Sequence, residues 1–170
     1  MSKKLLAPRS SLLAGAEADS RLLSAARGLC YNRCAMVIFR EIEHTADVAL
    51  HVQGRDLSEL LVNAARGMTS LLCPGADVVA SVETRECEVV AFDAEGLLVE
   101  WLSELAFWAE KDRFVCTGYE VLSSSPTHMR AVCRGGRALD LYRHIKAVTY
   151  HNLQILQTEQ GLQTTIVFDV

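Results

Sequence analysis

Two stretches of this chain repeat apolar residues at the spacing of an amphipathic helix. The first follows Asp56, a predicted N-cap, and stops at Cys73-Pro74-Gly75, because proline cannot continue the helical hydrogen bonds. The second begins near Asp93 and ends around Glu110–Arg113. The predicted buried side of the second helix carries Leu97, Leu98, Trp101, Leu102, Leu105 and Trp108. Each helix must therefore cover one apolar side with another layer of structure.

Most of the remaining chain consists of short apolar or alternating segments between turn signals, a pattern typical of strands. The expected strands are Val37–Glu43, Val48–Gln53, Val82–Phe92, Phe114–Leu122, Met129–Cys133, Ile145–Leu156 and Leu162–Val170. Gly135-Gly136 is interpreted as a turn. Two helices with a largely antiparallel sheet predict an α+β fold, a two-layer sandwich in which both helices pack on the sheet.

Length and composition indicate one folded domain. The chain has 170 residues, and 50% of them are hydrophobic. We expect residues 36–170 to form this domain, and we interpret residues 1–35 as a disordered or targeting-like N-terminal extension. No apolar run reaches the ~18 residues that a membrane-spanning helix needs.

Charge and cysteine content bear on the class of protein. A net charge of -4 argues against holding nucleic acid by bulk electrostatics, because neutralising phosphates takes clustered Lys and Arg. The six cysteines are scattered, with no Cys-x-x-Cys pair. Several of them lie in apolar runs, where we interpret them as small buried hydrophobes rather than as metal or redox sites. The pattern suits a protein of a reducing compartment.

Carboxylates gather at the predicted ends of two strands. Asp169 precedes Val170, whose terminal carboxylate adds a second anion, and Asp47 lies at the end of a neighbouring strand. Such anions repel one another, and a cation would stabilise them. A site made only of oxygen atoms favours a hard ion such as Ca²⁺, Mg²⁺ or Mn²⁺ over zinc. On this pattern alone, aspartates that are simply solvated remain the alternative.

Three further side chains have two interpretations each. His44 and His151 are either hydrogen-bonded structural histidines or contacts to a phosphate or a metal. Lys146, within an apolar strand, either extends its ammonium group to solvent or pairs with a carboxylate. The chain carries no Ser-His-Asp order and no Gly-rich phosphate loop that would identify a familiar catalytic site.

Several motifs together resemble the archease family. They are His44-Thr45-Ala46-Asp47 after an apolar strand, Leu97–Leu102, Lys146-Ala147-Val148-Thr149-Tyr150-His151, and the ending Phe168-Asp169-Val170. The resemblance covers Val37 to Val170. It implies a metal-binding protein that is not itself an enzyme. Proteins of this family activate the RtcB-type RNA ligase of tRNA splicing by helping it to become guanylylated by GTP and to turn over repeatedly.

The resemblance also implies residue roles. Asp47, Asp169 and the Val170 carboxylate would hold a divalent cation, with Ca²⁺ expected and Mg²⁺ or Mn²⁺ as alternatives, and His44 and Lys146 would lie near it. His151 is a further candidate contact to the partner or to a phosphate. The implied partner is the ligase or its complex, with RNA contacted only indirectly and no membrane involved. The link to tRNA splicing places the protein in the cytoplasm, the nucleus or both.

One departure from the family bears on activity. Family members usually have a longer connection, with a Gly and a Glu, before the strand that begins here near Ile145, whereas Asp140–His144 runs almost directly into it. A lost carboxylate would lower the affinity for the ion, since affinity follows the charge and number of ligands. The alternatives to an activator are a metal-dependent phosphoesterase or nuclease that uses the same carboxylates, and a chaperone-like interaction module.

Overall fold

The structure is a computed structural model that describes residues 39–43, 47–76 and 79–170. The predicted extension over residues 1–35, the proposed start of the domain at residue 36, and His44 lie outside the described residues. In chain order the elements are β1 (Phe39–Glu43), β2 (Asp47–Gly54), α1 (Leu57–Leu72), β3 (Glu83–Val90), α2 (Ala94–Asp112), β4 (Phe114–Ser125), β5 (His128–Arg137), β6 (Ala147–Thr149), β7 (Leu156–Thr158) and β8 (Gly161–Asp169).

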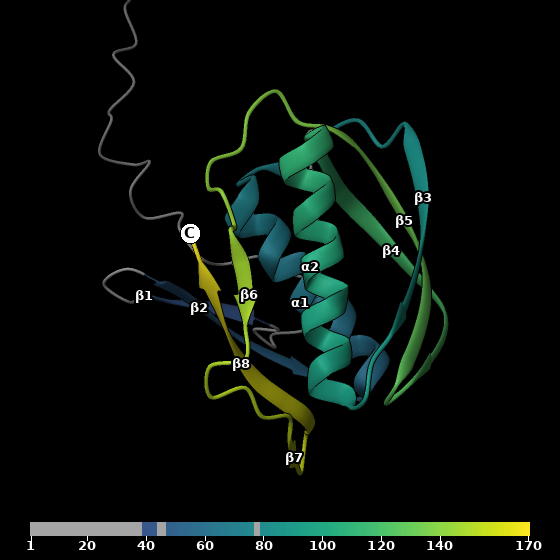
Figure 1. Ribbon diagram of the computed structural model, residues 1–170, viewed down its shortest axis with the longest axis vertical. Coiled ribbons are helices and arrows are strands. Elements are labelled where there is room, and N and C mark those ends of the chain that lie inside the picture. Colours follow the sequence, from purple (N-terminus) through teal and green to yellow (C-terminus); the bar gives the residue numbers. More distant parts are fainter. Residues whose placement is uncertain (1–38, 44–46, 77–78) are drawn as a thin grey trace, which may run out of the picture.

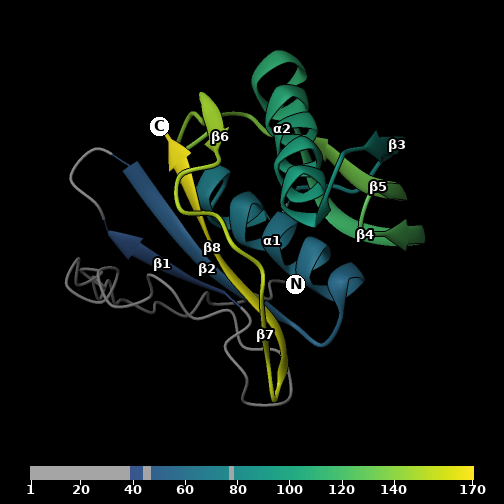
Figure 2. The same cartoon turned by 60° about the horizontal axis from the view of Figure 1, so that its bottom comes forward.

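The strands form two antiparallel sheets. The first has the order β1-β2-β8-β6, with β7 also paired to β8, and the second has the order β3-β5-β4. Both helices lie between the sheets (Figures 1 and 2), where α1 contacts β2 and β4, and α2 contacts β4 and β6. The predicted α+β class, with two helices and antiparallel strands, is confirmed.

The division into two sheets follows from how α2 is buried. Its buried residues are spread around the helix rather than confined to one stripe; they are Gly96, Leu97, Leu98, Val99, Trp101, Leu102, Leu105, Ala106, Trp108 and Ala109. A helix that is apolar on more than one side needs cover on more than one side. One sheet would leave part of this surface in water, and the second sheet covers it.

The predicted helix boundaries are confirmed by their caps. The Asp56 side chain accepts a hydrogen bond from the Glu59 amide at 2.9 Å, and Asp93 accepts one from the Gly96 amide at 2.7 Å. Each satisfies a backbone donor that has no partner within its helix. The first helix ends at Cys73, directly before the proline.

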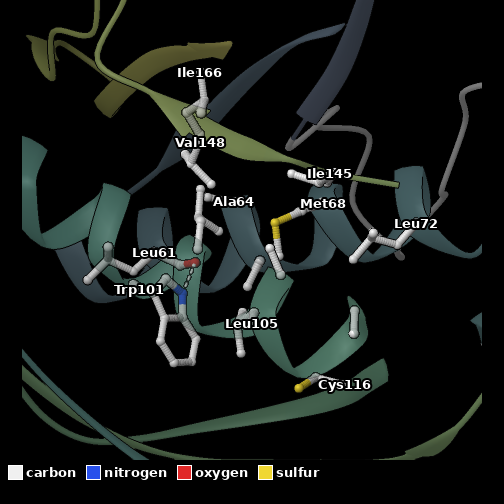
Figure 3. Packing of buried hydrophobic residues seen from close by; sticks show 14 of the residues in the cluster. Leu61, Ala64, Met68, Leu72, Trp101, Leu105, Cys116, Ile145, Val148 and Ile166 are labelled. Atoms are coloured by element: carbon white, nitrogen blue, oxygen red, sulfur yellow. Dashed lines mark hydrogen bonds between the residues drawn. The ribbon is translucent and has the colours of Figure 1, made fainter. Parts of the chain in front are cut away.

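The core lies between the two sheets and surrounds Trp101 (Figure 3). The Trp101 ring is fully buried, and its indole N–H donates to the Leu61 carbonyl at 3.1 Å. Cys87, Cys116 and Cys133 are buried in the second sheet, as expected for small hydrophobes. Burial raises the pKa of the Cys87 thiol to about 12, so this thiol stays protonated and unreactive in the native protein.

Two local predictions are wrong. The single strand expected over Ile145–Leu156 is interrupted, because the chain leaves the sheet after β6 and passes through Asn152, whose φ of 50° is left-handed. The turn expected at Gly135-Gly136 instead lies within strand β5, close to its C-terminal end. A side chain at Gly135 would overlap the Val115 carbonyl oxygen, so this glycine permits a close approach of two backbones.

We expect Gly135→Ala to destabilise the fold by about 1–3 kcal/mol, the usual cost of forcing extra atoms into a packed region. Urea unfolding of the purified protein would measure the loss as a lower midpoint. Gly118→Ala is the matched control on the same strand pair, because its added methyl group would meet the Arg134 Cβ at an ordinary 3.7 Å. Equal midpoints for Gly135→Ala and the wild type would contradict the close approach.

Candidate functional site

The two predicted aspartates face each other across the first sheet. Asp47 is the first residue of β2 and Asp169 the last of β8, and the two are register partners. Both are exposed. Partners in an antiparallel pair share a face and have Cβ atoms about 4.5–5.5 Å apart. The pairing therefore places two carboxylates side by side at one end of the sheet.

Lys146 joins this end from a distant part of the sequence. Its backbone amide donates to the Asp169 carbonyl at 2.8 Å, directly before β6 pairs with β8. Its ammonium group donates to the main-chain oxygen of Val170, also at 2.8 Å. Figure 1 shows β6 beside the last strand, with the C-terminus at the same end. Of the two interpretations of this lysine, the structure supports a contact with the end of the chain.

The oxygen atoms at this end suit a hard divalent cation. Among the described residues, neither Asp47 nor Asp169 has a side-chain ion pair or hydrogen bond, and like charges directly opposite each other destabilise a sheet. The same residues contain no group of three or more His, Cys, Asp and Glu side chains placed to hold a metal. The donors are therefore two side-chain carboxylates and the oxygen of Val170. An ion held by so few protein ligands keeps several coordination positions for water or another ligand.

The two predicted histidines do not both join this end. His44 lies outside the described residues, three positions before Asp47 in the sequence. His151 follows the opposite end of β6, and its Nε2 lies 3.1 Å from the Asn152 carboxamide nitrogen. The structure therefore brings together Asp47, Asp169, Val170 and Lys146, and it separates His151 from them.

Several hydrogen bonds and ion pairs hold the short connection before β6 against the rest of the domain. Arg143 donates to Glu41 of β1 at 2.5 Å, and the Tyr142 amide donates to the Leu72 carbonyl at 2.8 Å. Glu110 of α2 lies 2.9 Å from His144 Nδ1 and also accepts from the Ile145 amide at 3.2 Å. These contacts position the connection so that Lys146 lies beside the end of β8, although the segment is short. Nothing local in the sequence indicated them, because each joins residues at least 30 positions apart.

The connection does not supply another carboxylate to the site. Asp140 is its only acidic residue, and its carboxylate pairs with Arg113 at 2.6 Å. The hydrogen bond from this guanidinium lowers the pKa of the Asp140 carboxyl. The connection therefore adds no free carboxylate beside Asp47 and Asp169. No described helix is long and apolar enough to cross a membrane.

Comparisons with known proteins agree with this architecture. The model of the Archease protein family (MTH1598/TM1083) matches residues 39–170. Protein archease of Methanosarcina acetivorans is 30% identical over 140 residues, which cover 78% of this chain and 95% of the relative. Protein archease of Methanopyrus kandleri is 36% identical over 131 residues, which cover 72% of this chain and 91% of the relative.

Two solved structures resemble the fold. The solution structure of protein 1598 of Methanobacterium thermoautotrophicum superposes with a TM-score of 0.68 at 26% identity, covering 79% of this chain and 100% of that one. The crystal structure of a Thermotoga maritima protein described as an archease and possible chaperone gives 0.53 at 23% identity, covering 76% and 94%, and shows the fold alone. The family model and the relatives show that this chain belongs to the archease family.

Proposed function

We propose that this protein activates an RNA ligase of the RtcB type, the ligase of tRNA splicing, and does not itself catalyse ligation. In this proposal it helps the ligase to become guanylylated by GTP and to turn over repeatedly. The observation that carries the proposal is the pairing of Asp47 with Asp169 beside Lys146 and Val170, at one exposed end of a chain of the archease family.

The proposed metal ligands are Asp47, Asp169 and the terminal carboxylate of Val170. Their oxygen donors suit Ca²⁺, with Mg²⁺ or Mn²⁺ as alternatives. Both aspartates are exposed, so a partner can reach an ion held between them. When bound, the ion would neutralise negative charge on the phosphate oxygens of GTP during nucleotidyl transfer.

Lys146 and His44 are the proposed phosphate contacts at this end. An ammonium group has three donors, and the Lys146 contact with Val170 uses one of them. The remaining donors can meet a phosphate that the ligase presents. His44 precedes Asp47 by three residues, so it is close to this end along the chain. RNA would be held by the ligase and would meet this protein only indirectly, in keeping with the net charge of -4.

Asp47→Asn should affect the free energy of unfolding differently in the absence and in the presence of the ion. Without added metal, Asp47→Asn should leave the protein as stable as the wild type or up to ~1 kcal/mol more stable, because it removes a like-charge pair. With the ion at 100 times its Kd, the wild type should gain about 2.7 kcal/mol, and the variant should lose most of that gain. Urea unfolding with chelator and with Ca²⁺, Mg²⁺ or Mn²⁺ measures both.

Glu86→Gln is the control for this comparison, because Glu86 is an exposed carboxylate on the second sheet. It should keep the full gain from the ion. If Asp47→Asn and Glu86→Gln respond equally to every ion, the proposed ligand set is wrong.

Single-turnover guanylylation of the partner ligase with GTP tests the activity itself. We expect the wild type to accelerate the step and Asp47→Asn to abolish the acceleration, with Glu86→Gln unaffected. A variant with a longer connection before Ile145, carrying a Gly and a Glu, measures what the shortened segment costs. Acceleration by this variant alone would mean that the natural chain keeps the fold and has lost the activity.

The same preparation distinguishes the alternatives. Hydrolysis of a cyclic phosphate by the protein without ligase, lost in Asp47→Asn, would replace the proposal with a metal-dependent phosphoesterase. Binding of the ligase without any acceleration, unchanged in Asp47→Asn, would replace it with a chaperone-like module.

A further inference from the structure

The connection between β6 and β7 leaves the first sheet beside β8 (Figure 1). Thr149 pairs with Val167 and Leu156 pairs with Gln163, so residues 150–155 lie opposite only residues 164–166. The Thr164 hydroxyl donates to the Gln154 carbonyl at 2.8 Å and ties this wide bulge to the strand. Bulges of this kind re-aim side chains and are frequent next to functional sites.

A surface pocket of about 140 Å³, called the cavity below, lies at this bulge and is open to solvent. It is lined by His51, Asn152, Gln154, Leu156, Gln163, Thr164 and Thr165. The lining offers an imidazole, carboxamides and hydroxyls, and none of these side chains is a carboxylate, an ammonium or a guanidinium. Pockets for drug-sized ligands measure about 300–1,000 Å³, so this cavity suits a group no larger than one ring system.

Two contacts hold the polar groups of the cavity in place. His51 Nδ1 lies 3.2 Å from the Thr165 hydroxyl, and the Asn152 carboxamide nitrogen lies 3.1 Å from His151 Nε2. Asn152 has a left-handed backbone with φ of 50°, a conformation that non-glycine residues adopt mainly at turns and functional sites. The contact with His151 leaves the Asn152 carbonyl oxygen and its second amide hydrogen for a ligand.

One wall of the cavity, formed by His51 and Thr165, lies on the same face of the strand pair as the carboxylate end. His51 pairs with Thr165, four positions along the ladder from Asp47 and Asp169, or about 13 Å at the rise of a strand. All four alternate to the face turned away from the helices. An uncharged hydrogen-bonding cavity thus lies in line with an end that carries Lys146 and the proposed ion.

We propose that the cavity binds the base of a nucleotide whose phosphates reach Lys146 and the ion, and for this phosphate end the inference rests on the proposed function. Carboxamides pair in bidentate fashion with base edges, which offer adjacent donors and acceptors. The lining offers no charged side chain that would hold a charged group there. The base is that of GTP, the nucleotide that the proposed function already requires.

The test measures nucleotide binding by the full chain in the absence of ligase. Titration calorimetry gives the affinity, and NMR amide shifts give the residues affected. The probes are GTP, an RNA trinucleotide ending in a 2′,3′-cyclic phosphate, and inorganic phosphate, each with Mg²⁺. Thr165→Val and Asn152→Gly should weaken nucleotide binding at least tenfold, and glycine keeps the left-handed backbone at position 152. Thr117→Val makes the same change as Thr165→Val on the second sheet and should leave binding unchanged.

The outcomes distinguish GTP from RNA as the ligand of the cavity. They also distinguish a failure of the cavity proposal from a failure of the proposed function. Saturable shifts at residues 151–156 and 163–165 with GTP support the cavity, and such shifts with the trinucleotide but not with GTP would overturn the assignment to GTP. Absence of binding, equal binding by inorganic phosphate, or wild-type affinity in both cavity variants would overturn it. Guanylylation that the wild type still accelerates would then leave the proposed function intact, whereas nucleotide binding without acceleration would remove the proposed function and keep the cavity.

Discussion

The pairing of β2 with β8 is the interaction on which the rest of the first sheet depends. It joins residues 47–54 to residues 162–169, at the two ends of the described domain. In this register the buried Leu50 lies opposite the buried Ile166, and both face the helices. A shift by one residue would turn these side chains to solvent and the aspartates toward the core. Burial on one face therefore determines what the other face displays.

The register of β2 with β8 also determines which side chains lie on the face turned away from the helices. Asp47 and Asp169 are neighbours because the hydrophobic residues next to them, Val48 and Phe168, pair in the core. The packing of the core thus offsets the repulsion between two adjacent carboxylates. A site that is unfavourable by itself in this way is suited to an ion that enters and leaves, because binding relieves a repulsion already present.

The connection before β6 shows how a short segment can still place Lys146 beside the end of β8. Ile145 is buried, and Glu110 of α2 holds the backbone next to it. Lys146 follows directly and contacts Val170. The position of the lysine therefore depends on α2 and on the core more than on the length of the connection. What the short connection lacks is a further carboxylate, since Asp140 is engaged with Arg113.

Local patterns determined the helices and their caps, the α+β class, and the burial of Cys87, Cys116 and Cys133. They also determined that Asp47 and Asp169 stand at the ends of strands. Each of these features depends on residues close in sequence or on a repeated apolar spacing. Tertiary structure alone decided the division into two sheets, the strand at Gly135, the bulge at Asn152, and the meeting of Lys146 with Val170. These features come from contacts between distant segments, where a close backbone approach or a register break leaves no periodic trace in the sequence.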